Sequence, residues 1–258
     1  MLLAADVGNT EIVLGVFRGP ELAHTWRVST QAERTADELA LLLSGFLEQK
    51  RISLGSDVTG LVVASVVPDV TAAIREMTRR FGAPAVIVGP GTKTGVPILT
   101  DNPREVGADR VVNALAAFTR FGGPAIVVDF GTATNFDVVS EKGEFVGGVI
   151  APGMQASAAS LFSRTARLTR VELVAPANVI GKSTVECMQS GLIYGTAGAV
   201  DSIVEGIRGE AGPATVIATG GLAPVVIPHC HTIDHHEPWL TLEGLRLVFD
   251  KNVVTADE

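Results

Sequence analysis

A short motif occurs twice in the chain and constrains its fold more than any other feature. LLAADVGNTEIVLGVF at 2–17 and AIVVDFGTATNFDVVS at 125–140 each hold an apolar run ending in Asp-x-Gly, a small polar turn and a second strand-like run. Asp6 and Gly8 correspond to Asp129 and Gly131, an offset of 123 positions in a chain of 258. One Asp-x-Gly is a common turn, but two in the same context predict a duplication into related halves.

Helical and strand-like segments alternate around the two motifs, which is the pattern of an α/β fold. Thr35 and Glu38 form a capping-box pattern before an apolar stripe of helical spacing. Further helix starts are expected at four places: Asp69, Asn102-Pro103, Ser183 or Thr184, and Thr241. Short β runs are expected at 60–65, 85–88, 125–129, 135–139 and 216–218. We therefore predict two related lobes, 1–118 with the first motif and 119–258 with the second.

Each Asp-x-Gly turn is suited to binding phosphate. Glycine has no Cβ, so the backbone N–H groups of a tight turn can approach phosphate oxygens closely. The carboxylate of Asp6 would repel a bare phosphate, and it becomes useful when Mg²⁺ lies between them. A third glycine element, Ala218-Thr219-Gly220-Gly221, follows another apolar run and could let an adenine ring lie against the backbone. Together the three elements indicate a nucleotide site.

Composition and charge exclude other classes of protein. The net charge is -8 and only 5% of residues are aromatic, so a nucleic-acid surface is not expected. Apolar stretches such as 60–67 and 215–227 are too short to span a membrane, and the N-terminus lacks the pattern of a signal peptide. Cys187 and Cys230 lack metal-site spacing and are expected to be buried free thiols in a cytoplasmic protein.

A cluster of histidines near the C-terminus is the other candidate for metal chemistry. His229, Cys230 and His231 are followed by Asp234, His235, His236 and Glu237. In a strand, His229 and His231 would share one face and Cys230 the other. No CxxC or HExxH spacing accompanies them, so a polar strand edge and loop is the preferred interpretation over a metal site.

The order DVGNT, DFGTATNFD, ATGG resembles the phosphate and adenosine motifs of the acetate and sugar kinase, heat-shock ATPase and actin superfamily. That resemblance implies two actin-like (ribonuclease H-like) lobes with a nucleotide cleft between them. DNPREVGADR at 101–110 narrows the match, and the chain resembles type III pantothenate kinases over nearly its whole length. Further similar segments are GEFVGGVIAPGMQ at 143–155, RTARLTRVEL at 164–173, GKSTVECMQSG at 181–191 and LTLEGLRLVF at 240–249.

The resemblance implies a reaction, cofactors and a set of site residues. Pantothenate would be phosphorylated by ATP with Mg²⁺ to 4′-phosphopantothenate, the first step toward coenzyme A, in a homodimer. Asp109 would be the catalytic base and Asp129 a ligand of K⁺ or NH₄⁺, with Asp6 near the Mg²⁺. Pantothenate would contact Gly107, Ala108, Asp109, Arg110 and, from the partner's side, Thr184. ATP would contact Thr132 and the first loop, which is Asp6, Val7, Gly8, Asn9, Thr10, Glu11, Ile12 and Val13.

The physical roles of these residues are plausible on their own. A carboxylate at Asp109 can accept the proton of a primary alcohol as the bond to phosphorus forms. The fork of Arg110 suits a carboxylate such as that of pantothenate. Thr184 could instead be a helix N-cap. Thr100 departs from the family, because many relatives have Tyr at that position in the substrate pocket.

Two alternative functions remain open at this point. The first is a kinase for another small alcohol, or an ATPase, on the same scaffold. The second is a non-catalytic accessory or regulatory protein that kept the fold. The DNPREVGADR segment argues against the first, and the intact Asp6, Asp109 and Asp129 argue against the second.

Overall fold

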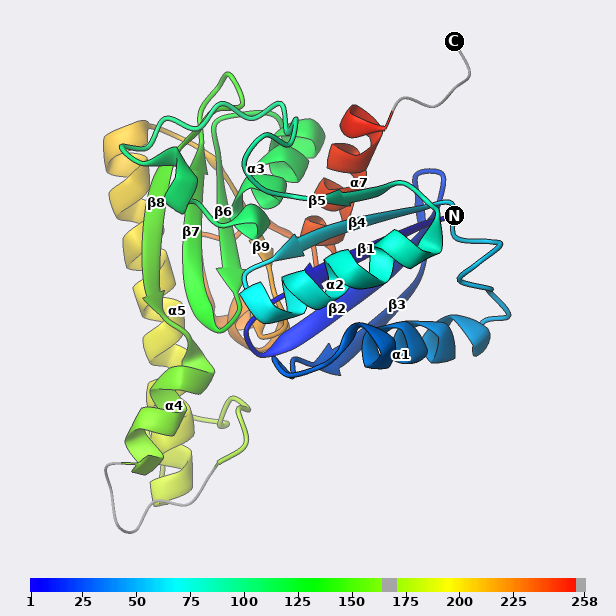
Figure 1. Ribbon diagram of the computed structural model, residues 1–258. Coiled ribbons are helices and arrows are strands. Elements are labelled where there is room, and N and C mark those ends of the chain that lie inside the picture. Colours follow the sequence, from blue (N-terminus) through cyan, green and yellow to red (C-terminus); the bar gives the residue numbers. More distant parts are fainter. Residues whose placement is uncertain (164–170, 254–258) are drawn as a thin grey trace. The chain divides into compact units, whose positions relative to one another are not determined.

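The computed structural model describes residues 1–163 and 171–253, and the chain forms two compact units (Figure 1). The first unit comprises Met1–Gly95, Asn102–Ala116 and Thr241–Glu258, and the second comprises Val96–Asp101 and Ala117–Leu240. The expected boundary at 118/119 cuts the chain once. In the structure, by contrast, Val96–Asp101 belongs to the second unit and Thr241–Glu258 belongs to the first. Of the motif at 164–173, residues 164–170 lie outside the described part.

The first unit is built on a five-stranded mixed sheet. Its strand order is β3-β2-β1-β4-β5. The hairpin pairs β1/β2 and β2/β3 are antiparallel, and the pairs β1/β4 and β4/β5 are parallel. The strands are β1 (Leu2–Val7), β2 (Glu11–Arg18), β3 (Glu21–Ser29), β4 (Gly60–Ser65) and β5 (Ala85–Ile87).

The second unit repeats this topology strand for strand. Its order β10-β9-β6-β7-β8, read from the other edge, is the same arrangement, with antiparallel β6/β7 and β7/β8 and parallel β6/β9 and β9/β10. The strands are β6 (Ala125–Phe130), β7 (Ala133–Val139), β8 (Phe145–Pro152), β9 (Thr215–Thr219) and β10 (His235–His236). The α/β class and the two related halves that the repeated motif predicts are therefore confirmed.

Each sheet has its own hydrophobic core, and the apolar helical stripes supply one side of it. In the first unit, α1 (Ala36–Glu48) and α2 (Pro68–Phe81) bury Leu39, Leu43, Leu47, Ile74 and Met77. In the second, α4 (Met154–Ser163) and α5 (Thr184–Ala211) bury Met154, Leu192, Ile193, Val200 and Val204. One long helix follows the last strand of each sheet in the chain: α3 (Ala108–Phe121) comes after β5, and α7 (Leu240–Asn252) comes after β10. The short elements are η1 (Pro103–Glu105), α6 (Ala223–Val226) and η2 (Ile227–His229).

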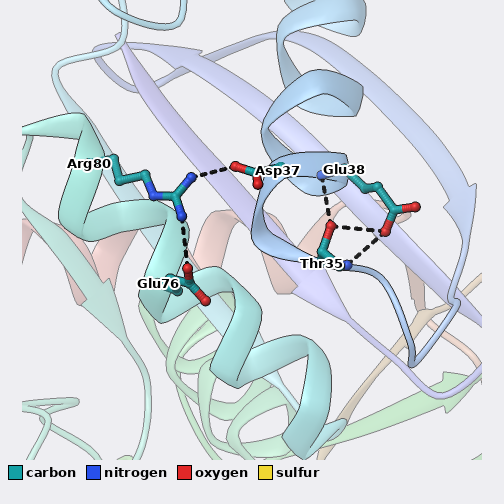
Figure 2. A network of polar contacts seen from close by, with 5 residues as sticks. All are labelled: Thr35, Asp37, Glu38, Glu76 and Arg80. Carbon is teal, nitrogen blue, oxygen red and sulfur yellow. Dashed lines mark hydrogen bonds and ion pairs between the residues drawn. The ribbon is translucent and has the colours of Figure 1, made fainter.

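The capping box expected at Thr35 is present at the start of α1 (Figure 2). Glu38 N donates to Thr35 Oγ1 at 3.3 Å, and Thr35 N donates to Glu38 Oε2 at 2.8 Å. The bond from Thr35 N and a second one from Thr35 Oγ1, which donates to Glu38 Oε2 at 3.1 Å, lower the pKa of the Glu38 carboxyl. Arg80 of α2 joins the two helices by an ion pair with Asp37 of α1, and it also pairs with Glu76 of its own helix at 2.8 Å. Exposed pairs of this kind contribute little free energy, so the buried leucines hold α1 in place.

Three of the expected helix starts are wrong. Helix α2 begins one residue before Asp69, at Pro68, and its N-cap Val67 makes no side-chain bond. Asn102 precedes only the 3-10 turn η1, because Val106 is extended and ends the turn before α3 begins. Thr241 lies inside α7, which starts at Leu240.

The histidine segment is not the strand that its alternation predicts. His229 ends the 3-10 turn η2 and meets the ring of Tyr194 edge-on, while only His235 and His236 form a strand. His235 stacks on Phe121, with ring centroids 4.6 Å apart. Within residues 1–163 and 171–253, no three His, Cys, Asp or Glu side chains gather as a metal site would require.

Two more expectations concern the cysteines and the membrane. Both thiols are free, but Cys187 is exposed, contrary to expectation, because it lies on the outer face of the first turns of α5. Burial raises the pKa of the partly buried Cys230 thiol to about 12. Among the described helices, none combines the length and apolar character needed to cross a membrane.

Candidate active site

The first turn, residues 6–13, joins β1 to β2 in the first unit. Asp6 pairs with Val13, and Gly8 N donates to Glu11 O at 3.0 Å, which leaves Asn9 and Thr10 exposed at the tip. A Cβ on Gly8 would lie 3.1 Å from Glu11 O, closer than most real Cβ contacts. The narrow turn therefore depends on glycine at this position.

Thr30, just past the end of β3, holds the first turn from one side. Its hydroxyl donates to Gly8 O at 2.7 Å and its backbone N–H donates to Thr10 O at 2.9 Å. Two carbonyl oxygens of the turn are thereby directed at Thr30. The sequence reasoning missed this residue, because no local pattern marks a threonine whose partners lie about twenty positions earlier.

The expected nucleotide residues 6–13 differ in what they can offer a ligand. Val7 and Ile12 are core residues, so only their main-chain atoms could contact ATP. The Glu11 carboxylate forms an ion pair with Arg27 at 3.3 Å. Asp6 is half-buried and is the last residue but one of strand β1, close to the exposed tip. A carboxylate of this kind suits Mg²⁺, which binds hard oxygen ligands.

The second turn, residues 129–135, joins β6 to β7 in the second unit. Asp129 pairs with Asn135, whereas Asp6 pairs with Val13, so the second turn is shorter than the first by one residue. Gly131 N donates to Ala133 O at 3.0 Å, and Thr132 is exposed at the tip. Asp129 is half-buried, as Asp6 is.

Glycines pack closely behind the second turn. A Cβ built on Gly220, just after β9, would lie 2.5 Å from Asp129 Oδ1. The missing Cβ lets this carboxylate oxygen lie close to the Gly220 backbone, and a carboxylate oxygen is a hard ligand of the kind that a cation would use. A Cβ on Gly153 would lie 2.9 Å from Gly131 O and closer still to Thr132 O. Neither close approach can be read from the sequence alone.

The proposed substrate segment opens helix α3 in the first unit. Asp109 is the second residue of the helix and is half-buried, and Arg110 N donates to its Oδ1 at 2.9 Å. Burial raises the pKa of the Asp109 carboxyl, and the hydrogen bond and positive charge of Arg110 oppose that rise only in part. A Cβ on Gly107 would collide with Asp109 Oδ1. Glycine at 107 thus leaves room for a carboxylate that is more basic than an ordinary aspartate.

The remaining expected substrate residues lie in the second unit. Thr184 is the exposed first residue of α5, and its possible role as N-cap is wrong, because Ser183 forms the capping box with Glu186. Thr100 is partly buried, and among the described residues its hydroxyl oxygen has no hydrogen-bond partner. Residues 6–13 and 107–110 therefore share the first unit, whereas Thr100, Asp129, Thr132 and Thr184 share the second.

A hollow of about 490 Å³ lies at the carboxyl end of β4, within the first unit. Ser65, Thr71, Arg75 and Arg79 are among its lining residues, and Thr71 Oγ1 donates to Ser65 Oγ at 2.7 Å. Val66 N donates to Val7 O at 3.0 Å, which connects the rim of the hollow to the first turn.

Comparison with known sequences places this chain in a family. Residues 2–206 match the family model for type III pantothenate kinase. The chain belongs to the type III pantothenate kinase family. A type III pantothenate kinase of Streptomyces griseus subsp. griseus is 56% identical over 265 residues, covering 99% of this chain and all of the relative. Those of Acidothermus cellulolyticus and Parafrankia sp. are 57% and 59% identical, over 98% of this chain and 99% and 98% of theirs.

Solved structures with low sequence identity share the fold of this pantothenate kinase family member. The activator of 2-hydroxyisocaproyl-CoA dehydratase from Clostridium difficile, with bound ADPNP, aligns with a TM-score of 0.58 and 11% identity, over 97% of this chain and 95% of that one. The ROK hexokinase of Thermus thermophilus aligns with a TM-score of 0.53 and 15% identity, over 96% and 97%. At these identities the likeness concerns the fold alone.

Proposed function

We propose that this protein transfers the γ-phosphoryl group of ATP to the primary hydroxyl of pantothenate, giving 4′-phosphopantothenate and ADP. This reaction opens the route to coenzyme A. The observation that carries the proposal is membership of the type III pantothenate kinase family over essentially the full chain. The half-buried Asp109, whose pKa is raised, agrees with it.

Asp109 acts as the general base. As the pantothenate oxygen bonds to the γ-phosphorus, its proton moves to a carboxylate oxygen of Asp109, and the bond between that phosphorus and the β–γ bridging oxygen breaks to release ADP. Oδ1 already accepts the Arg110 N–H, so Oδ2 is the oxygen for the proton. A raised pKa makes the ionised carboxylate of Asp109 a stronger base toward the hydroxyl proton.

Residues 6–13 and Thr132 bind ATP, and Gly107, Ala108, Asp109, Arg110 and Thr184 bind pantothenate. The Arg110 guanidinium suits the pantothenate carboxylate, because its planar fork can donate two parallel hydrogen bonds. Asp6 holds the Mg²⁺ that accompanies ATP, and Asp129 holds a monovalent cation, K⁺ or NH₄⁺. These ions would supply positive charge for the phosphates. The protein itself has a net charge of -8 and offers positive charge only at individual Lys and Arg side chains.

The active form is a cytoplasmic homodimer formed through the second unit. Strand β8 is the edge of its sheet, and the exposed fraction of Ile150 on that strand is 64%. Val179 and Ile180, just before α5, are 64% and 84% exposed. Val179 and Ile180 precede Thr184 by five and four residues, and exposed apolar side chains of this kind support burial against a second copy, which would bring Thr184 to the partner's substrate.

A coupled assay of ADP release tests the function directly. Pantothenate, ATP and Mg²⁺ are supplied with K⁺ and then with Na⁺ alone, and Asp109→Asn is the matched inactive variant. We expect turnover that needs pantothenate and K⁺. Turnover only with another alcohol would contradict the proposal, and so would ATP binding without any transfer, as expected of an accessory protein.

A further inference from the structure

Two glycines that lie outside the second turn press against it. Gly220 follows β9, and a Cβ built there would lie 2.5 Å from Asp129 Oδ1 and 2.7 Å from Phe130 N. Gly153 follows β8, and its Cβ would lie 2.7 Å from the carbonyl carbon of Thr132. Real Cβ atoms essentially never approach other atoms within 3.0 Å. Any side chain at either position must therefore displace the turn.

We propose that Gly220 and Gly153 are positioning residues for phosphoryl transfer, with separate effects on the second turn. Gly220 sets the Asp129 carboxylate and thereby the response of nucleotide binding to K⁺. Gly153 sets the Gly131 and Thr132 carbonyl groups and thereby the turn that contacts ATP, whichever monovalent cation is present. The inference rests on the proposed function, because that function makes Asp129 the ligand of a monovalent cation.

The sheet fixes the position of Gly220. Thr219, the residue before it, pairs with Asp129 across the parallel strands β9 and β6. On the other side of Gly220, Leu222 N donates to Phe130 O at 3.3 Å. Bonds on both sides prevent Gly220 from moving away, so an added methyl group would push on Asp129 Oδ1. Its φ of +93° is also a conformation that favours glycine.

Gly153 meets different atoms of the turn. Its nearest neighbours are the carbonyl groups of Thr132 and Gly131, and no atom of Asp129 is among its three closest contacts. Ser157 N donates to Gly153 O at 2.9 Å, so this glycine also starts the hydrogen bonding of α4. An added methyl group would move the tip of the turn while leaving the Asp129 carboxylate where it is.

Two other glycines of the second unit serve as controls. Gly212 has a φ of +87°, close to that of Gly220, but a Cβ there meets nothing within 4 Å. Gly212→Ala therefore also places a side chain at a positive φ of similar size, without the collision. Gly195 lies in α5, also with open space at its Cβ, and Gly195→Ala is the control for Gly153→Ala.

The test is calorimetric binding of a non-hydrolysable ATP analogue with Mg²⁺, measured while K⁺ replaces Na⁺ at constant ionic strength. We expect Gly220→Ala to raise the K⁺ concentration at half-maximal effect by ~10- to 100-fold, the usual cost of disturbing a group that orients a metal ligand. Gly212→Ala should keep the wild-type midpoint. Gly153→Ala should weaken the affinity for the ATP analogue by the same factor in K⁺ and in Na⁺. Gly195→Ala should keep the wild-type affinity in both.

If Gly220→Ala does not fold, Asp129→Glu replaces it, because one more methylene moves the carboxylate out of the place that Gly220 defines. We expect the same loss of the K⁺ response. A wild-type K⁺ midpoint in Gly220→Ala or in Asp129→Glu overturns the inference, as does wild-type binding that ignores K⁺. Wild-type binding that responds to K⁺, without phosphorylation of pantothenate, overturns the proposed function alone.

Discussion

The two Asp-x-Gly turns occupy the same place in two sheets of identical topology, yet different interactions hold them. Thr30 holds the first turn by two hydrogen bonds to carbonyl oxygens. Gly153 and Gly220 hold the second turn by close packing. A hydrogen-bonded turn can be loosened by removing one hydroxyl, whereas a packed turn is disturbed by adding one methyl group. The duplicated fold thus carries two equivalent turns with opposite expected sensitivities to mutation.

The two units also differ in the helix that follows the last strand of each sheet, which is α3 after β5 and α7 after β10. The second residue of α3 is Asp109, whereas the second residue of α7 is Thr241. A Cβ on Gly244 of α7 would lie 2.6 Å from the carbonyl carbon of Val112 in α3, so these two helices pack closely within the first unit. The repeat therefore places the carboxylate that we propose as the base in one helix and a packing surface in its counterpart.

The largest expected effect comes from removing the proposed base, Asp109, which only the first copy carries. Asp109→Asn should lower kcat by ~10²- to 10⁴-fold, the range for a positioned general base, because the amide cannot accept the hydroxyl proton. Its Oδ1 can still accept the Arg110 N–H, so folding and nucleotide affinity should be retained. Steady-state kinetics and calorimetry check both points, and a variant with full kcat would remove Asp109 from the mechanism.

The pH dependence of the wild-type protein sharpens the same point. Burial raises the pKa of Asp109 above its ordinary 3.8, and the base works only when ionised, so kcat/KM should fall as pH drops through that raised pKa. The free energy of unfolding changes with pH in the opposite direction to the activity. The folded state holds the proton more tightly, so ionisation of Asp109 costs stability as pH rises through its folded pKa. Asp109→Asn should therefore melt no lower than wild type at pH 7, and a clearly lower Tm would contradict this assignment.

Loosening the first turn should have a smaller effect. Thr30→Val removes the hydroxyl that donates to Gly8 O, and the loss of one hydrogen bond corresponds to a rise in the KM for ATP of ~2- to 10-fold. Thr71→Val is the matched control, because Thr71 also loses a buried hydroxyl, but its partners are Ser65 Oγ and Val67 O. Equal KM values for the two variants would show that Thr30 does not hold the turn.

Each unit has a helix that begins with a capping box, and removing the capping hydroxyl is the change with the smallest expected effect on activity. Thr35→Ala and Ser183→Ala each remove an N-cap hydroxyl and should each cost ~1 kcal/mol, which lowers Tm by about 2–4 °C in a chain of this size. Only Ser183 precedes a proposed substrate residue, Thr184. The KM for pantothenate should therefore rise in Ser183→Ala and stay unchanged in Thr35→Ala, and thermal melts with kinetics on both variants measure this.

The sequence predicts features that depend on neighbours along the chain. The repeated motif predicts the shared topology, and Thr35 with Glu38 predicts a cap, because the bonded atoms lie within one turn. Asn102-Pro103 misleads, since the helix it seems to open is interrupted by the extended Val106. Thr30, Gly153 and Gly220 escape prediction, because their contacts depend on strand register between distant segments. Family resemblance, rather than residue pattern, is the basis for proposing Asp109 as the base.

The central claim is that the two equivalent aspartates serve different cations, and one cross-titration tests it most directly. Binding of a non-hydrolysable ATP analogue is measured in Asp6→Asn and Asp129→Asn while Mg²⁺ and K⁺ are varied separately. We predict that Asp6→Asn loses the response to Mg²⁺ and keeps that to K⁺, and that Asp129→Asn does the reverse. Loss of both responses in each variant, or of neither, would contradict the claim.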